Sequence, residues 1–235
     1  MKSALPNLLT LLNLACGILA LLALQDQQFW LAAGLVGGSL AADFLDGFVA
    51  RLLGVHSEVG LQLDSLADVV SFGVVPGFFL WELFQQARLG SEPIPAFLPY
   101  LSFLVPLFAA LRLARFNVDT RQQEHFLGLP TPALTLFIFS AGLWGLTTDA
   151  TGVEAFLLHP MWLTVLTLGG AFLLVVEWPL LSFKVKEWTW RANRARLILL
   201  AGVALLLLLL RWRALAFVIP LYLLVSAIFR PRDPR

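Results

Sequence analysis

Residues 4–24 have the sequence ALPNLLTLLNLACGILALLAL, a stretch without a charged side chain. A helix needs roughly 20 mainly apolar residues to cross a bilayer, so this stretch predicts a membrane-spanning helix. Lys2 is the only charged residue before this stretch, and no small-residue cleavage site of a signal peptide follows it. We therefore expect the helix to be retained and not cleaved. Across the 235 residues 59% are hydrophobic and 13% are charged, against about 25% charged in soluble domains. This composition excludes a water-soluble globular fold.

Further apolar stretches follow, separated by polar residues, proline or glycine. In total there are eight candidate spans, at residues 4–24, 28–53, 61–85, 96–117, 130–147, 153–176, 196–210 and 214–229. The last two are short and are separated only by residues 211–213, so seven spans stay an alternative. A β-barrel would show short alternating segments, whereas residues 204–210 are continuously apolar. We predict an all-α polytopic membrane bundle of about eight transmembrane helices, forming a single integral membrane domain over residues 1–235.

The distribution of basic residues predicts the orientation of the bundle. With eight spans and the N-terminus inside, all Lys and Arg residues face the cytoplasm except Arg88, Arg211 and Arg213. The basic stretch 184–196 is then either an interfacial segment against anionic headgroups or an ordinary solvated loop. The formal net charge of +1 indicates no nucleic-acid partner, and the single Cys16 cannot form an internal disulfide.

Ionisable side chains interrupt the apolar pattern of the second and third spans, where such groups are costly and therefore indicate function. The residues that share a helical face are Asp43, Asp46, Gly47, Ala50 and Arg51 in the second span and Gly60, Asp64 and Asp68 in the third. The loop between the spans is short, which makes them antiparallel neighbours. The four aspartates are therefore expected to converge on one cavity near the inner interface. The alternative is a set of acids solvated by water at the helix ends.

Four like charges in a low-dielectric site require either protonation or a cation between them. Carboxylate oxygens favour Mg²⁺ or Mn²⁺, and two such ions can clamp a pyrophosphate. Gly47 and Ala50 would let a bulky ligand approach the helix, and Arg51 offers planar donors that suit a phosphate.

The same residues carry a resemblance. The pattern Asp43-x2-Asp46-Gly47-x2-Ala50-Arg51-x8-Gly60-x3-Asp64-x3-Asp68 resembles, without departure, the signature of the CDP-alcohol phosphatidyltransferases. The resemblance implies an integral membrane enzyme that transfers a phosphatidyl group from a CDP-linked lipid to an alcohol and releases CMP. It further implies that Asp43, Asp46 and Asp64 bind metal and that Asp68 shares the metal or acts as the base. It implies that Gly47 and Arg51 face the CDP pyrophosphate, with Ala50 and Gly60 also at the CDP-lipid site, and that the enzyme is a homodimer.

The flanks of the signature are similar to the bacterial phosphatidylserine synthase branch. The stretch from Ser65 to Pro76 carries this similarity, as do residues 5–13, 114–117 and 128–132. The resemblance thus covers about residues 5–132, taken as the catalytic core, and leaves residues 133–235 as C-terminal spans. It implies CDP-diacylglycerol and L-serine as substrates, in a bacterial plasma membrane with the site at the cytoplasmic face. Other acceptors, namely inositol, inositol phosphate, glycerol 3-phosphate and choline, stay open.

Serine carries a carboxylate that requires a cation. Arg112 and Arg115, one turn apart, could hold that carboxylate or a lipid phosphate, or could simply anchor the span at the interface. Asn13 and Ser71 could orient a substrate or form interhelical hydrogen bonds. A different class of protein, an ion-coupled transporter, would also use intramembrane acids, but no second inverted set of acids occurs in the C-terminal half.

Overall fold

The computed structural model describes residues 4–55, 57–90, 94–118, 128–147, 152–178 and 190–229. Within these ranges the chain is helical with no strand, as the sequence predicts. The segments 184–189 and 230–235, which contain basic residues, lie outside the described ranges. Of the predicted interfacial segment 184–196, the structure therefore describes only residues 190–196.

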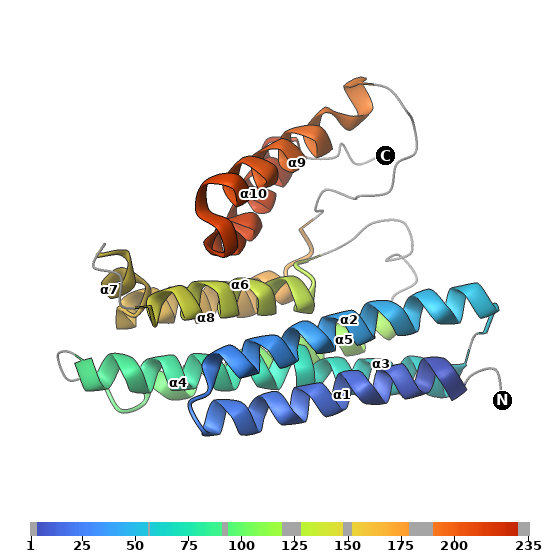
Figure 1. The fold of residues 1–235 in the computed structure, drawn as a ribbon, viewed down its shortest axis with the longest axis horizontal. Coiled ribbons are helices and arrows are strands. Elements are labelled where there is room, and N and C mark those ends of the chain that lie inside the picture. The colour runs from blue at the N-terminus through green and yellow to red at the C-terminus, as the bar shows by residue number, and fades with distance from the viewer. Residues whose placement is uncertain are drawn as a thin grey trace.

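The first two helices form an antiparallel hairpin that lies along one side of the molecule (Figure 1). They are α1 (Ala4–Gln25) and α2 (Phe29–Leu53). Small residues of α1, among them Gly17, Ala20 and Ala23, are buried, which allows neighbouring helices to approach α1 closely; Gly17 lies against Ser71. Gly54 ends α2 with a φ of 60°, a left-handed conformation that glycine adopts without a steric cost. This sharp ending turns the chain back toward α1.

The third span is one continuous helical rod with a wider turn in its middle. It consists of α3 (Glu58–Val69), a π-helical turn η1 (Val70–Val74) and α4 (Val75–Gly90). Ser57 begins the rod, because its side chain accepts a hydrogen bond from the backbone N–H of Gly60 at 3.2 Å. The Thr135 hydroxyl donates to the carbonyl of Phe72 in the π turn at 3.1 Å. π turns of this kind are frequent at functional sites.

The apolar core lies around α4, whose fully buried side chains include Phe79, Leu80 and Leu83. The helices packed around it are η2 (Leu98–Phe103), α5 (Leu104–Val118), α6 (Thr131–Gly145) and α8 (Pro160–Val175), with the short α7 (Val153–Leu157) before α8. The rings of Phe79 and Phe139 stack with their centroids 4.4 Å apart, which joins α4 to α6.

The last two helices are α9 (Trp190–Leu210) and α10 (Leu215–Ile228), joined by η4 (Arg211–Ala214). They lie side by side and incline away from the rest of the molecule, and α10 packs against α6 (Figure 1). Arg211 has a φ of 52°, which breaks the helix at the point where the sequence predicts an interruption.

Among the residues that the structure describes, five helical segments are long and apolar enough to cross a membrane, with Asn193–Ile228 counted as one segment. Helices α6 and α8 are shorter apolar helices. Seven of the eight predicted spans coincide with a helical segment, whereas the predicted span 153–176 is divided into α7 and α8, because Pro160 starts a new helix after His159. The number of helices that cross the bilayer stays a prediction. Many large apolar side chains on α1 and α2, such as Leu8, Trp30 and Phe44, are exposed. The chain is an integral membrane protein, and such side chains form its surface toward lipid.

Close packing of α4 against η2 and α5 leads to a stability prediction. A Cβ atom added at Gly77 would lie 2.7 Å from Cδ of Pro106, a rigid ring that cannot rotate away. We expect Gly77→Ala to destabilise the fold by about 1–3 kcal/mol, which a lower melting temperature in detergent would reveal. Gly34→Ala is the matched control, because nothing lies within 4 Å of its Cβ and alanine favours a helix. Equal melting temperatures for the two variants would contradict this packing.

Candidate active site

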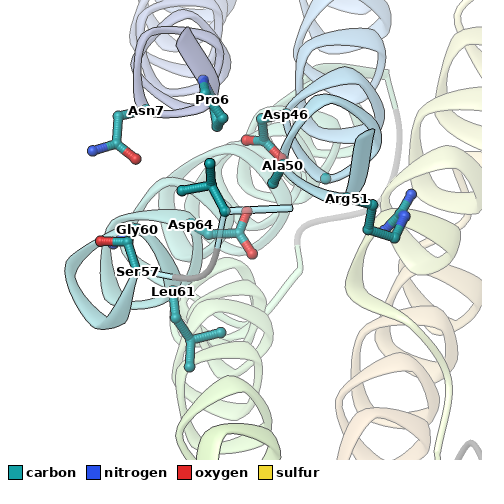
Figure 2. Close-up of a pocket in the computed structure, with 11 residues that line it drawn as sticks. Pro6, Asn7, Asp46, Ala50, Arg51, Ser57, Gly60, Leu61 and Asp64 are labelled. Atoms are coloured by element: carbon teal, nitrogen blue, oxygen red, sulfur yellow. The ribbon is translucent and has the colours of Figure 1, made fainter. Parts of the chain in front are cut away.

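A cavity of about 310 Å³ opens where the end of α2, the start of α3 and the start of α1 meet. Its lining residues are Pro6, Asn7, Asp46, Gly47, Ala50, Arg51, Val55, Ser57, Gly60, Leu61 and Asp64. Figure 2 shows Asp46 and Asp64 in the space between these helices, with Asn7 and Gly60 on the left of the view and Arg51 on the right. The cavity thus contains residues from both predicted faces, together with residues of α1.

Three carboxylates gather beside this cavity. Asp43, Asp64 and Asp68 each offer one oxygen, and these oxygens lie within 4.8 Å of one another. Asp68 is only 8% exposed, and Oδ1 of Asp64 is buried without a hydrogen-bond partner among the described residues. Burying several carboxylates together is costly unless a cation lies between them. The oxygen donors, their spacing and the unpartnered Asp64 atom fit a hard divalent cation such as Mg²⁺ or Mn²⁺.

The fourth aspartate, Asp46, has a different environment from the other three. It lines the cavity but is 6% exposed, and its Oδ2 accepts a 2.6 Å hydrogen bond from the Thr10 hydroxyl. It still interacts electrostatically with Asp64. The structure therefore brings all four predicted aspartates to one region, three as a tight cluster and one bonded to α1.

The glycines of the signature leave room for neighbouring side chains. A Cβ atom at Gly47 would lie 3.3 Å from Nη1 of Arg51, and one at Gly60 would lie 3.2 Å from Oδ1 of Asn7. Arg51 is exposed, and its guanidinium folds back over Gly47 at the edge of the cavity. A ligand in the cavity can therefore meet a cation at its edge and carboxylates at its inner end.

Helix α1 supplies two contacts to the aspartates: an interhelical hydrogen bond from Asn13, which the sequence offered as one alternative, and one from Thr10, which it did not indicate. Asn13 is fully buried, and its Nδ2 donates to Oδ1 of Asp68 at 3.1 Å. Thr10, which bonds Asp46, precedes it by three residues, so both side chains lie on one face of α1. The three-residue spacing was the sequence signal that these two side chains share a face, but only the tertiary structure reveals which carboxylates they bond. Pro6, Asn7 and Ser57 are further cavity residues without an assigned role.

The remaining predicted residues divide between the site and the exterior. Arg112 is 9% exposed, its Nε has no hydrogen-bond partner among the described residues, and it interacts electrostatically with Asp68. Arg115, one turn further along α5, is exposed. Ser71 is fully buried, and its hydroxyl donates to the backbone carbonyl of Asn13 at 3.1 Å. Of the two arginines, only Arg112 is placed to act at the aspartate cluster.

A contact between α3 and α5 joins two stretches on the flanks of the aspartates. Nδ2 of Asn117 donates to Oγ of Ser65 at 2.9 Å. Ser65 directly follows Asp64, and Asn117 follows the helical turn that carries Arg112 and Arg115. The end of α5 is therefore tied to the aspartate-bearing helix.

Comparisons with known proteins identify the family to which the chain is similar. The model of the CDP-alcohol phosphatidyltransferase family matches residues 3–168. The CDP-diacylglycerol–serine O-phosphatidyltransferase of Helicobacter pylori (strain J99) is 37% identical over 137 residues, 57% of this chain and 54% of that protein. The protein of the same name in Bacillus subtilis is 29% identical over 179 residues, 76% of this chain and 90% of that protein.

An archaeal protein shows a comparable similarity. The archaetidylserine synthase of Methanothermobacter thermautotrophicus is 37% identical over 153 residues, 62% of this chain and 60% of that protein. The chain thus spans between about half and nine tenths of the length of these relatives. The aspartate cluster lies within residues 3–168, the region that the family model matches.

Proposed function

The chain belongs to the CDP-alcohol phosphatidyltransferase family, and on this basis we propose that it transfers the phosphatidyl group of CDP-diacylglycerol to L-serine. The products are phosphatidylserine and CMP. The observation that carries the proposal is the cluster of Asp43, Asp64 and Asp68 beside a cavity that the family signature lines. The names of the Helicobacter and Bacillus relatives support serine as the acceptor.

The aspartates would hold the divalent cations that this chemistry requires. Asp43, Asp64 and Asp68 form the tight oxygen cluster, and Asp46, which lines the same cavity, would contribute to a second ion. Bound Mg²⁺ or Mn²⁺ would neutralise the pyrophosphate and make its phosphorus more electrophilic. Arg51, at the edge of the cavity, would bind a pyrophosphate oxygen, while Gly47, Ala50 and Gly60 leave space for the CDP group.

The reaction is a substitution at the phosphorus that carries the diacylglycerol. The serine oxygen forms a bond to this phosphorus, and the bond from the phosphorus to the bridging oxygen of CMP breaks. Asp68 accepts the hydroxyl proton, because an unassisted serine hydroxyl is a poor nucleophile at neutral pH. A nearly buried carboxylate beside the cation-binding oxygens suits that role.

Arg112 would recognise the serine carboxylate. It is a buried cation that interacts with Asp68, so a carboxylate bonded to Arg112 would bring the serine hydroxyl near the proposed base. The unpartnered Nε of Arg112 supports this assignment, since a buried donor requires an acceptor. Arg115, which is exposed, is assigned to the membrane interface.

The proposal also covers the setting of the enzyme. We assign the catalytic core to residues 5–132 and place the cavity at the cytoplasmic face of a bacterial inner membrane, in a homodimer. The charge distribution along the chain supports the orientation, because most Lys and Arg residues then face the cytoplasm.

Acceptor-dependent CMP release tests the proposed function. The purified protein is supplied with CDP-diacylglycerol, Mg²⁺ or Mn²⁺, and serine, inositol, glycerol 3-phosphate or no acceptor. We expect release that requires both serine and metal. Release with inositol or glycerol 3-phosphate instead would retain the family chemistry but overturn the choice of acceptor, and ion flux without CMP release would favour a transporter.

A further inference from the structure

Asn13 lies behind the aspartate cluster, between α2 and α3. It is fully buried, and its Nδ2 donates to Oδ1 of Asp68. Its Oδ1 accepts a 2.5 Å hydrogen bond from the hydroxyl of Ser39, a residue of α2 that is also fully buried. One side chain of α1 thus connects a hydroxyl of α2 to a carboxylate of α3.

The partners of the Asn13 amide determine its orientation. An ionised carboxylate only accepts hydrogen bonds, so the NH₂ group of the amide must face Asp68. The amide oxygen then faces Ser39, whose hydroxyl donates to it and to the backbone carbonyl of Asn13 at 2.8 Å. Ser71 donates to the same carbonyl from the π turn that follows Asp68. Asn13 is therefore fixed through its side chain and its backbone.

This arrangement leaves no exposed surface with which Asn13 could contact a substrate, but it fixes the carboxylate proposed as the base. We infer that Asn13 is a positioning residue: its amide, oriented by Ser39, fixes one oxygen of Asp68 so that the other faces the cation and the serine hydroxyl. The inference rests on the proposed function, because it assumes that Asp68 acts in transfer. Groups that hydrogen-bond a metal-binding carboxylate typically contribute about 10–100-fold to metal affinity or activity.

Substitution of Asn13 and Ser39, singly and together, tests this role. Asn13→Ala is expected to lower kcat by about 10–100-fold and to change KM for CDP-diacylglycerol and serine little, because no substrate contact is lost. Ser39→Ala is expected to lower kcat less. The double variant is expected to match Asn13→Ala, because Ser39 acts through the amide. Losses that multiply in the double variant would overturn the inference.

A second measurement does not depend on turnover. Without substrates, Mg²⁺ or Mn²⁺ is expected to raise the melting temperature of the wild-type protein, and Asn13→Ala should need about 10-fold more metal for the same rise. An unchanged metal requirement together with an unchanged kcat would overturn the inference. If Asn13→Ala does not fold, Ser39→Ala carries the test, and an unchanged kcat in that variant has the same meaning.

The control is Thr167→Ala, which removes a fully buried hydroxyl that bonds within α8 to the carbonyl of Leu163. Loss of this hydroxyl should lower the melting temperature of Thr167→Ala but leave its kcat and its metal affinity unchanged. The wild type and Asp68→Asn distinguish a failure of the proposed function from a failure of the role of Asn13. Failure of wild-type transfer would contradict the proposed function, whereas active wild type, inactive Asp68→Asn and fully active Asn13→Ala would contradict only the role of Asn13.

Discussion

Replacing Asp64 with asparagine is expected to abolish phosphatidyl transfer while leaving the fold intact. The amide has nearly the shape of the carboxylate, but it removes a charge from the three-oxygen cluster and changes the buried Oδ1 that has no partner among the described residues. Metal ions supply several kcal/mol of transition-state stabilisation, and about 4 kcal/mol corresponds to about 10³-fold in rate. CMP release at saturating substrate, measured with and without added Mg²⁺, is the assay.

The control for this prediction is Asp26→Asn. Asp26 is an exposed aspartate in the turn between α1 and α2, whereas Asp43 lies in the second half of α2. Its removal should leave turnover unchanged. Asp43→Asn and Asp68→Asn are expected to behave as Asp64→Asn does. Wild-type turnover in a folded Asp64→Asn protein would refute the assignment of the cluster as the catalytic metal site.

Replacing Arg112 with glutamine is expected to reduce kcat/KM for serine by about 10²-fold. Charge-assisted hydrogen bonds contribute about 1.5–3 kcal/mol, and Arg112 is a buried cation proposed to bind the serine carboxylate. KM for CDP-diacylglycerol should change little. Ethanolamine, which is serine without its carboxylate, should be a poor acceptor for the wild type, and the preference for serine over ethanolamine should diminish in the variant.

Arg115→Gln is the matched control, because Arg115 has the same side chain on the same helix but is exposed. It should retain the wild-type preference for serine. A loss of serine preference in Arg115→Gln, with Arg112→Gln unaffected, would move the carboxylate site away from the aspartate cluster.

Helical periodicity was sufficient to predict the convergence of the aspartates. Asp64 and Asp68 lie one turn apart on α3, and the short connection after α2 leaves few ways to place Asp43 except beside them. The break between α9 and α10 was also visible in the sequence, as Arg211 and Arg213 interrupt an apolar run.

The hydrogen bonds that α1 makes to the aspartates could not be predicted in the same way. Thr10 and Asn13 lie more than thirty residues before their partners Asp46 and Asp68, and their hydrogen bonds depend on how α1 packs against α2 and α3. Asn13 in particular resembles any small polar residue that forms an interhelical hydrogen bond. The π turn after Asp68 could not be predicted from the residues around it. The carbonyl of Phe72 in this turn accepts a hydrogen bond from Thr135 of α6, a helix that is distant in the sequence.

If the aspartate cluster supports transfer of a phosphatidyl group to serine, one CMP is released for each phosphatidylserine formed, and this stoichiometry can be measured. The purified protein would be given CDP-diacylglycerol, Mg²⁺ and labelled serine, and both CMP and label in the chloroform-soluble lipid would be measured. We predict equal amounts of CMP and labelled lipid, and neither product in the presence of a chelator or in Asp64→Asn. CMP release without labelled lipid, or labelled lipid formed equally by Asp64→Asn, would contradict this role of the cluster.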